Sequence, residues 1–555
     1  MSTDNIFNKN LRLVFLLIIS AEILSFLGYY WQMINFLTFF AVTILALIIS
    51  LRRLEYGLYI LLAELFIGSF GYLFYFETGG LKISLRLALW LIIMSVWLAK
   101  TAVSWAKTKQ LNVAFLKSNY FNYFFVLFIF ISWGVVNGFF NGNSLSNIFF
   151  DFNQWLYFLL IFPIFQILMD ENNLKILKQI FLAGIIWLSF KTILLAYFFS
   201  HNFSYFALDL YRWVRLSGLG EITQVQGGFY RVFMQSQIFI LIGFFILAIV
   251  IARSASERGS LPRIKCGVGT GSAISRTSSV HQIAILHSVA RNNKKKVFIA
   301  SFLLSLFLST IVISFSRSFW LGLLAGGISV WFIIIFKLRI RLKQFIVFNS
   351  IILLAAFLSL VLALAIVFFP YPAPLGGFNT TALLSDRATG LTGEAGASSR
   401  WQLLPPLWQK IKQAPVMGQG FGATVTYKTS DPRILKTNPG GIYTTYAFEW
   451  GWLDVWLKLG ILGLLAYLIL FAKIIFTGLK INTTLSLSLV CGLIVLAAVN
   501  IFSPYVNHPL GIGYLMIAAA MLEQLSLRGA PANADPSPAS SAGSGQASQS
   551  HELLT

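Results

Sequence analysis

Long apolar runs recur along almost the whole chain and are separated by short polar or basic segments. A helical run of about 20 residues is long enough to cross the roughly 30 Å hydrocarbon core of a bilayer. In lipid, backbone polar groups must be satisfied within the segment, so continuous runs indicate helices, whereas a β-barrel would show short alternating segments. The pattern predicts an all-α, polytopic membrane protein with about 14 transmembrane helices. The predicted spans are residues 11–29, 32–51, 55–76, 84–105, 120–140, 154–169, 179–200, 233–252, 297–315, 318–336, 345–369, 451–476, 484–503 and 509–526.

One long polar segment, roughly Tyr371 to Phe448, differs from the other long loops. It is balanced in charge and rich in Gly, Thr and aromatic residues, whereas the others are strongly basic. We predict that it forms one large periplasmic loop that carries the chemistry. The predicted organisation is residues 1–232 with the N-terminal helices, 233–370 with the central helices and a basic cytoplasmic loop at 253–296, 371–448 as the large loop, 449–526 with the C-terminal helices, and 527–555 as a disordered cytoplasmic tail.

Positive charge predicts the orientation. The chain has 41 Lys and Arg against 19 Asp and Glu, a net charge of +22. On a soluble protein this excess would suggest nucleic acid, but in a membrane protein Lys and Arg gather in cytoplasmic loops. The basic residues before the first span, after the second, fourth and tenth spans, and within 253–296 all fall on one side. We therefore expect both termini to be cytoplasmic and no nucleic-acid partner.

Metal and disulfide chemistry have little support in the sequence. Cys266 falls in the basic loop and Cys491 inside a predicted helix, so the two cannot pair. The five histidines show no zinc-binding spacing. We predict no disulfide, no metal site and no cofactor.

Arginines on the outer side are the strongest candidates for function. Arg231 begins the eighth predicted span, Arg317 lies in a short outer turn, Arg212 and Arg215 lie in Tyr-Arg-Trp-Val-Arg-Leu, and Arg400 lies in the large loop. Guanidinium groups bind phosphate oxygens in a bidentate manner and stay charged in a low dielectric. Several that converge on one outward cavity would suit a pyrophosphate. Alternatively, each could reach lipid headgroups or pair with a carboxylate.

Three segments, in order, resemble the O-antigen ligase and O-antigen polymerase superfamily of bacterial inner-membrane glycosyltransferases. They are Ser314-Phe-Ser-Arg-Ser-Phe-Trp; Arg400-Trp…Trp408 with Pro415-Val-Met-Gly-Gln-Gly-Phe-Gly; and Glu449-Trp-Gly-Trp-Leu-Asp-Val-Trp-Leu-Lys-Leu-Gly. The resemblance covers roughly residues 230–525 and extends to the position of the large loop.

The resemblance implies metal-independent, inverting transfer of a glycan from a polyprenyl-pyrophosphate carrier to a saccharide or lipid acceptor hydroxyl, outside a bacterial inner membrane. Such enzymes build surface polysaccharides such as lipopolysaccharide or exopolysaccharide. Catalytic roles are implied for Glu449, Arg317 and Arg400, pyrophosphate binding for Arg231, Arg317, Arg400 and Arg215, and sugar binding for Tyr443, Tyr446 and Trp450. These aromatic residues could instead belong to an interfacial aromatic belt.

Glu449 departs from the family pattern, because it stands where the family has a histidine that helps to activate the acceptor. A carboxylate can also act as a general base. The alternative is that Glu449 is a structural ion-pair partner. The difference leaves open a polymerase or a ligase with an acceptor other than lipid A core, and the sugar and the oligomeric state also stay open.

A membrane transporter, of lipid-linked oligosaccharide or of a small solute such as bicarbonate, is the main alternative. It should place charges near helix midpoints. The candidates are Glu22, Glu64, Lys191, and Asp454 with Lys458. A passive scaffold is a third alternative. The clustering of unusual charges on the outer side favours an extracytoplasmic enzyme.

Overall fold

The computed structural model describes residues 9–258, 298–383 and 395–529. Most of the predicted basic loop (259–297) and of the predicted tail (530–555) lies outside the described residues. Within the described part, eleven helices are long and apolar enough to cross a membrane, and Phe298–Ile313 and Thr484–Val499 form two shorter apolar helices. The prediction of a helical, polytopic membrane protein is confirmed, whereas the count of 14 stays a prediction.

The helices of the bundle follow the apolar runs. They are α1 (Lys9–Tyr30), α2 (Gln32–Arg52), α3 (Leu54–Ile67), α4 (Leu85–Thr108), α5 (Phe121–Phe140), α6 (Leu145–Phe152), η3 (Trp155–Leu160), α7 (Ile161–Leu168), α8 (Glu171–Ser200), α10 (Ile238–Arg258), α12 (Arg317–Phe332), α13 (Leu342–Val367), α17 (Gly451–Ile481), α18 (Thr484–Val499) and α19 (Pro509–Gly529).

Two predicted spans have the wrong bounds. The span predicted at 55–76 ends at Ile67, and the chain continues into an antiparallel hairpin of β1 (Tyr75–Thr78) and β2 (Leu81–Ser84). The helix stops because Ser69 and Gly71 adopt left-handed backbone conformations, with φ of 48° and 92°. The span predicted at 154–169 is the second part of a longer apolar segment, Leu145–Leu168, in which η3 separates α6 from α7.

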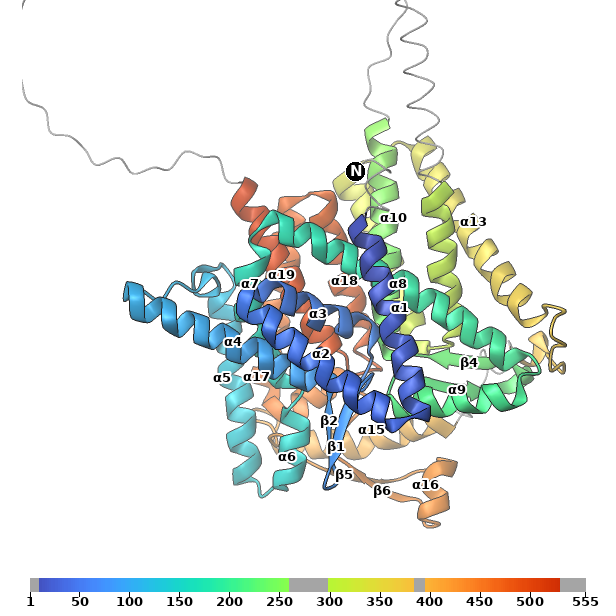
Figure 1. The fold of residues 1–555 in the computed structure, drawn as a ribbon, viewed down its shortest axis with the longest axis horizontal. Coiled ribbons are helices and arrows are strands. Elements are labelled where there is room, and N and C mark those ends of the chain that lie inside the picture. Colours follow the sequence, from blue (N-terminus) through green and yellow to red (C-terminus); the bar gives the residue numbers. More distant parts are fainter. Residues whose placement is uncertain (1–8, 259–297, 384–394, 530–555) are drawn as a thin grey trace, which may run out of the picture.

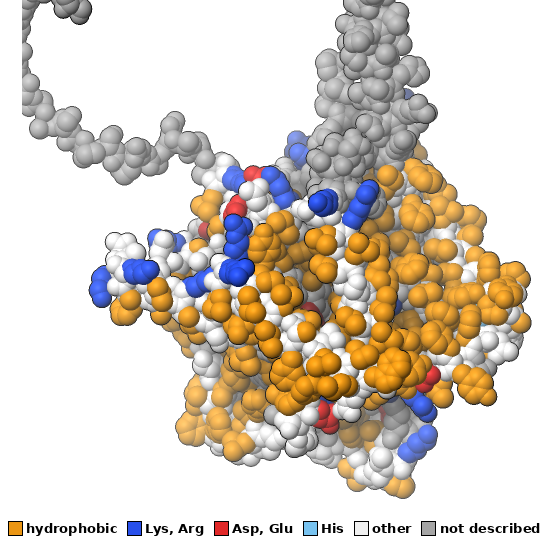
Figure 2. Space-filling view, viewed as in Figure 1, with side chains coloured by type: hydrophobic (Ala, Val, Ile, Leu, Met, Phe, Trp, Pro, Cys, Tyr) orange, Lys and Arg blue, Asp and Glu red, His pale blue; other side chains and the backbone are white. Residues whose placement is uncertain are grey.

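Burial separates a central from a peripheral set of helices. In the most apolar window of Pro509–Arg528, 83% of the residues are buried, against 11% in Leu342–Val367. Helix α19 is therefore central to the bundle, while α13 has the exposed, apolar surface of a lipid-facing helix. Figure 2 shows hydrophobic side chains over the broad middle of one face, with Lys and Arg mainly toward its upper end and on projecting α4.

Short polar elements gather at one end of the bundle. They are α9 (Ser204–Leu216), β3 (Glu221–Gln224), β4 (Tyr230–Phe233), α15 (Ala395–Gln413), β5 (Val425–Lys428), α16 (Pro432–Thr437) and β6 (Ile442–Thr445). Strand β3 pairs with β4, and β5 with β6, both antiparallel. Elements α15, β5, β6 and α16 lie low in Figure 1, with α9 and β4 above them on the right, whereas the start of α1 and the ends of α10 and α19 lie at the opposite end. The part of 371–448 that is described is thus remote from both ends of the described chain.

Charges inside the bundle are paired. The Lys191 ammonium lies 2.5 Å from the Glu22 carboxylate, and the Arg86 guanidinium lies 2.8 Å from the Glu64 carboxylate. All four side chains are buried. The transporter hypothesis relied on charges near helix midpoints. Three of these charges therefore hold helices together: Glu22, Glu64 and Lys191.

Candidate active site

Arg231 and the serine-rich turn before α12 lie in contact, although Arg231 and Ser314 are 83 positions apart in sequence. Arg231 is on β4, and its Nε donates to the carbonyl of Ser314 over 3.0 Å. The guanidinium also lies 4.8 Å from the centre of the Phe233 ring. The β3–β4 hairpin thus directs one predicted arginine onto the turn that presents another, Arg317.

The turn itself is tightly built. Phe315 has a φ of 44°, which L-residues seldom adopt, and the Ser316 amide donates to Ser314 Oγ over 3.3 Å. Arg317 is the first residue of α12 and is partly exposed. The Ser316 and Ser318 hydroxyls lie 3.0 Å apart. These bonds fix the backbone on both sides of Arg317, so the base of its side chain has a defined position.

The segment between α18 and α19 contacts the serine turn before α12. The Ser503 hydroxyl donates to Ser318 Oγ over 3.0 Å, and the Tyr505 hydroxyl donates to the carbonyl of Gln235 over 3.0 Å. Burial raises the pKa of Tyr505, and the charge of Arg231 acts in the opposite direction. Tyr505 therefore remains a neutral hydrogen-bond donor close to Arg231.

Arg400 and Glu449 form an ion pair. This contact agrees with the alternative hypothesis that Glu449 is a structural ion-pair partner. The Arg400 Nε donates to the Glu449 carboxylate, and the side chains are 34% and 50% exposed. A small hydrophobic core positions the pair by packing α15 against β5 and the start of α17. It includes Leu403, Leu407, Ile411, Val425, Phe448, Trp450 and Leu457. Both groups can therefore meet a ligand from the polar side.

Trp450 connects this ion pair to the serine turn. Its indole N–H donates to the carbonyl of Arg400 over 3.0 Å, and its ring centre lies 5.1 Å from that of Phe502. Phe502 precedes Ser503, which contacts Ser318. Arg231, Arg317, Arg400 and Glu449 thus lie around one connected framework. Trp450 is buried, so its predicted sugar-binding role would require a movement that exposes its ring.

Helix α17 begins two residues after Glu449 and is interrupted at Gly460. The backbone of Gly460 has φ 73° and ψ 177°, which are not helical values. The Gln419 amide donates to the carbonyl of Leu457 over 2.6 Å, and the Ile461 amide donates to that of Pro415 over 2.9 Å. Broken helices are tolerated at membrane depth where other protein groups satisfy the backbone. Residues 415–420 of the large loop do this here.

The glycines of this segment follow a tight backbone path against α5. Gly420 has a φ of 77°, and a Cβ added there would lie 2.1 Å from the amide nitrogen of Gly138 in α5. The Phe421 amide donates to the carbonyl of Gly134, also in α5, over 2.8 Å. The large loop is thereby fixed between α5 and α17.

Three buried charges lock this arrangement. Lys458 Nζ lies 2.6 Å from Asp151 Oδ1 and 2.6 Å from Asp454 Oδ1. Asp151 also accepts from the Gly422 amide over 2.9 Å, and Asn507 donates to Asp454. Asp454 and Lys458, two of the charges considered for a transporter, thus form an ion pair. Asp151 was not predicted from the sequence as a partner of Lys458, although a lone carboxylate in an apolar segment indicates a buried partner.

The other predicted residues lie outside this framework. Arg215, on α9, lies 3.0 Å from Glu221 at the start of β3, and both side chains are about 40% exposed. Tyr443, on β6, lies opposite Tyr427, with ring centres 6.0 Å apart. Tyr446 is partly exposed just after β6. Burial raises the pKa of Tyr427, which keeps the phenol available as a donor or acceptor to Ser399.

Within residues 9–258, 298–383 and 395–529, no group of three or more His, Cys, Asp or Glu side chains could hold a metal ion. Two acidic groups of this region, Glu449 and Glu221, are instead paired with Arg400 and Arg215.

One family model matches part of the chain. Residues 301–468 match the family model described as O-antigen ligase. The match includes the serine turn, Arg317, Arg400, Glu449 and the break at Gly460, which the fold brings to one end of the bundle. No curated protein sequence matches the chain.

Proposed function

Because the chain belongs to the O-antigen ligase superfamily, we propose that it transfers a glycan from a polyprenyl-pyrophosphate carrier to an acceptor hydroxyl at the extracytoplasmic face of a bacterial inner membrane. The family supports a role in glycosyl transfer for surface polysaccharide synthesis. The observation that carries the proposal is the contact between Arg231 and Ser314 beside Arg317. It brings two outer arginines from distant segments to one place.

The chemistry follows from the charge that develops during transfer. The acceptor oxygen attacks the anomeric carbon as the bond from that carbon to the pyrophosphate oxygen breaks, so the pyrophosphate leaves with the bonding electrons. Fixed cations beside a leaving group stabilise this charge without reorganisation. Arg317 and Arg231 supply such cations, with Arg400 at the other side of the framework. Attack opposite the leaving group inverts the anomeric centre, and no metal is required.

Glu449 accepts the proton of the acceptor hydroxyl. Its partner Arg400 donates to the carboxylate through Nε, and the Glu449 side chain is 50% exposed, so an acceptor hydroxyl can reach it. When the pyrophosphate binds, Arg400 can divide its donors between phosphate and Glu449, because a guanidinium has five N–H groups. The ion pair is therefore compatible with a base as well as with a structural role.

Transport has weaker support. Glu22–Lys191, Glu64–Arg86 and Asp454–Lys458 are closed pairs within the bundle. A carrier would need charges that line a polar path. Polymerase and ligase activities both remain within the proposal, and product length would distinguish them.

The test uses the purified full-length protein in detergent with a polyprenyl-pyrophosphate oligosaccharide from the host. Release of polyprenyl pyrophosphate and formation of elongated or transferred glycan are measured together. We expect turnover by the wild type and a loss of about 100- to 1,000-fold in Arg317→Ala, as for removal of one preorganised donor.

Arg528→Ala is the matched control, because Arg528 forms an exposed pair with Glu171. Its turnover should equal that of the wild type. Donor binding without turnover by the wild type would contradict the enzyme assignment and favour transport. Full turnover by Arg317→Ala would show that the pyrophosphate does not bind at this turn.

A further inference from the structure

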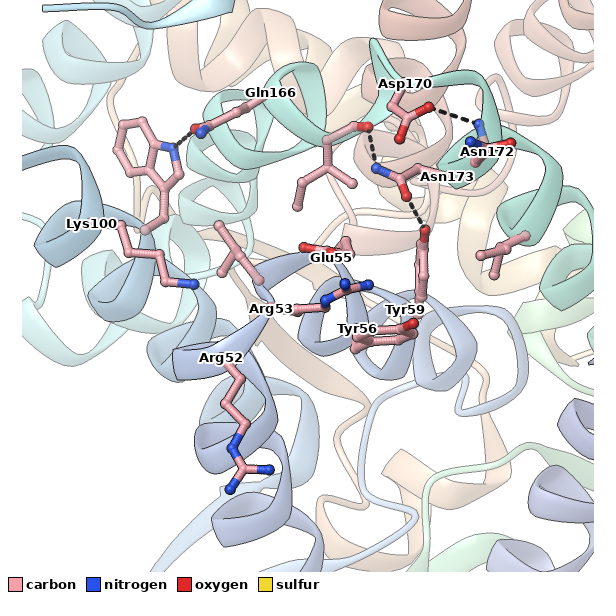
Figure 3. A pocket seen from close by; sticks show the side chains of 14 residues that line it. Arg52, Arg53, Glu55, Tyr56, Tyr59, Lys100, Gln166, Asp170, Asn172 and Asn173 are labelled. Atoms are coloured by element: carbon pink, nitrogen blue, oxygen red, sulfur yellow. Dashed lines mark hydrogen bonds between the residues drawn. The ribbon is translucent and has the colours of Figure 1, made fainter. Parts of the chain in front are cut away.

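A polar cavity lies away from the candidate active site. Its volume is about 580 Å³, and it lies where α2 meets α3, bordered by α4, α7 and the start of α8. None of the residues that line it belongs to the large loop or to the serine turn. Figure 3 shows its side chains converging from these separate helices. The proposed glycosyl transfer gives this cavity no role.

Three cations line the cavity: Arg52, Arg53 and Lys100. In Figure 3, Arg53 and Lys100 extend toward the middle, whereas Arg52 extends away toward the edge. Among the described residues, none of the three forms an ion pair. This differs from Arg86, Lys191 and Lys458, each of which faces a carboxylate inside the bundle.

The cations are held in place by neutral groups. Lys100 Nζ donates to the carbonyl of Ser50 over 2.9 Å, and the Arg53 guanidinium lies 6.0 Å from the Tyr56 ring centre. These contacts orient the groups and leave further N–H donors unused. A guanidinium and an ammonium that face one cavity are suited to phosphate oxygens.

Neutral polar groups and two carboxylates complete the lining. The amide of Asn173 links Tyr59 and the carbonyl of Ile167, and Asp170 accepts from the Asn172 amide. Glu55 and Asp170 are the acidic groups. Counting Arg52, the cations exceed the carboxylates by one, so an anion with a single negative charge balances the cavity.

Apolar surface adjoins the cavity. Leu51 and Leu98 are each 56% exposed, directly before Arg52 and two residues before Lys100. The lining also includes Leu54, Ile167 and Ile176. Helices α2 and α4 are both long and apolar enough to span a membrane. Arg52 follows closely on the apolar stretch of α2, and Lys100 follows closely on that of α4. An occupant with a phosphate and hydrocarbon chains satisfies both surfaces.

We propose that this cavity binds the phosphate of an anionic phospholipid, with Arg53 and Lys100 as its main contacts and Arg52 at its edge. Basic pockets between membrane helices on the positively charged side bind such headgroups. A lipid held there would bridge α2, α3, α4 and α8 and stabilise their packing. This site is independent of the proposed glycosyl transfer.

The test measures lipid binding to the full-length protein in detergent by native mass spectrometry, with phosphatidylglycerol as the probe and phosphatidylcholine for comparison. We expect binding of phosphatidylglycerol to weaken about 5-fold in Arg53→Gln or Lys100→Gln and about 30-fold in the double variant. Phosphatidylcholine binding should not change. Arg53→Lys keeps the charge and should stay within about 2-fold of the wild type.

A matched control and two contrary outcomes make the test decisive. Lys107→Gln with Lys343→Gln removes two exposed cations outside the cavity and should leave binding intact. Unchanged phosphatidylglycerol binding by the folded double variant would overturn the site. If inorganic phosphate alone raises the unfolding temperature of the wild type as much as the lipid does, the occupant is a soluble anion and the lipid assignment is wrong.

Discussion

The buried charges Asp151, Lys458 and Asp454 and the partly exposed pair Arg400–Glu449 show two different uses of ionisable groups. Asp151, Lys458 and Asp454 have side chains that are at most 7% exposed, and the Lys458 ammonium contacts both carboxylates. Arg400 and Glu449 are 34% and 50% exposed. The first group is closed to any ligand, whereas the second can exchange partners.

This difference distinguishes charges that hold the fold together from charges that can take part in a reaction. A buried charge in an apolar segment invites a functional interpretation. Here the deepest charges connect helices and the large loop, and the partly exposed ones lie where distant segments meet. Variants of the first group should therefore change stability, and variants of the second should change turnover.

The largest stability effect is expected for Lys458→Met. It leaves two carboxylates buried without a counter-charge, and breaking a buried pair in this way costs about 3–5 kcal/mol. Chemical unfolding of the purified protein in detergent measures the loss. The exposed pair Arg528–Glu171 offers a control, since Arg528→Met should cost less than about 1 kcal/mol.

A compensated variant sharpens this result. Replacing Asp151 and Asp454 by Asn together with Lys458→Met removes all three charges, and well-packed neutral replacements of buried pairs are often nearly neutral in stability. We expect recovery of most of the lost stability. Equal stability of Lys458→Met and the wild type would show that this cluster does not hold the loop.

Glu449→Gln should act mainly on turnover. The amide keeps the size of the side chain but cannot accept the proton, and loss of a general base lowers turnover by about 100-fold or more. Single-turnover rates and donor affinity should be measured together, and the affinity should hardly change. A loss below about 5-fold, as in the exposed-pair control Glu171→Gln, would leave Glu449 with only a structural role.

Gly460→Ala tests whether the break in α17 supports the site. The added Cβ would lie 2.0 Å from the carbonyl oxygen of Val416, at a φ of 73° that strains any L-residue. We expect a loss of about 2 kcal/mol or more in stability, with turnover reduced because Glu449 lies on the same segment. Gly327, in α12, has open space around it, so Gly327→Ala should be neutral or slightly stabilising.

The sequence predicted the helices well because the bilayer sets the length and polarity of each span. It also singled out Arg231 and Arg317, which the fold brings to one turn, because charged residues in or beside apolar segments depart from local expectations. It missed the hairpin after Ile67 and the partners Asp151, Asn507 and Arg86, because pairing across helices depends on rotation and depth. The contact of Ser503 with Ser318 gave no signal at all, since serine is common in loops and in helices.

Arg215→Ala should have the smallest effect on turnover. Arg215 was predicted to bind pyrophosphate with Arg231, but it pairs with Glu221, at the end of the hairpin away from the strand position of Arg231. An exposed pair of this kind contributes little, so we expect a loss of less than about 5-fold. The rate with a polyprenyl-pyrophosphate donor should be compared with that of Arg231→Ala, which should fall further. If Arg215→Ala lost as much as Arg317→Ala, the pyrophosphate site would have to extend over α9, and the division between paired and ligand-facing cations would fail at that point.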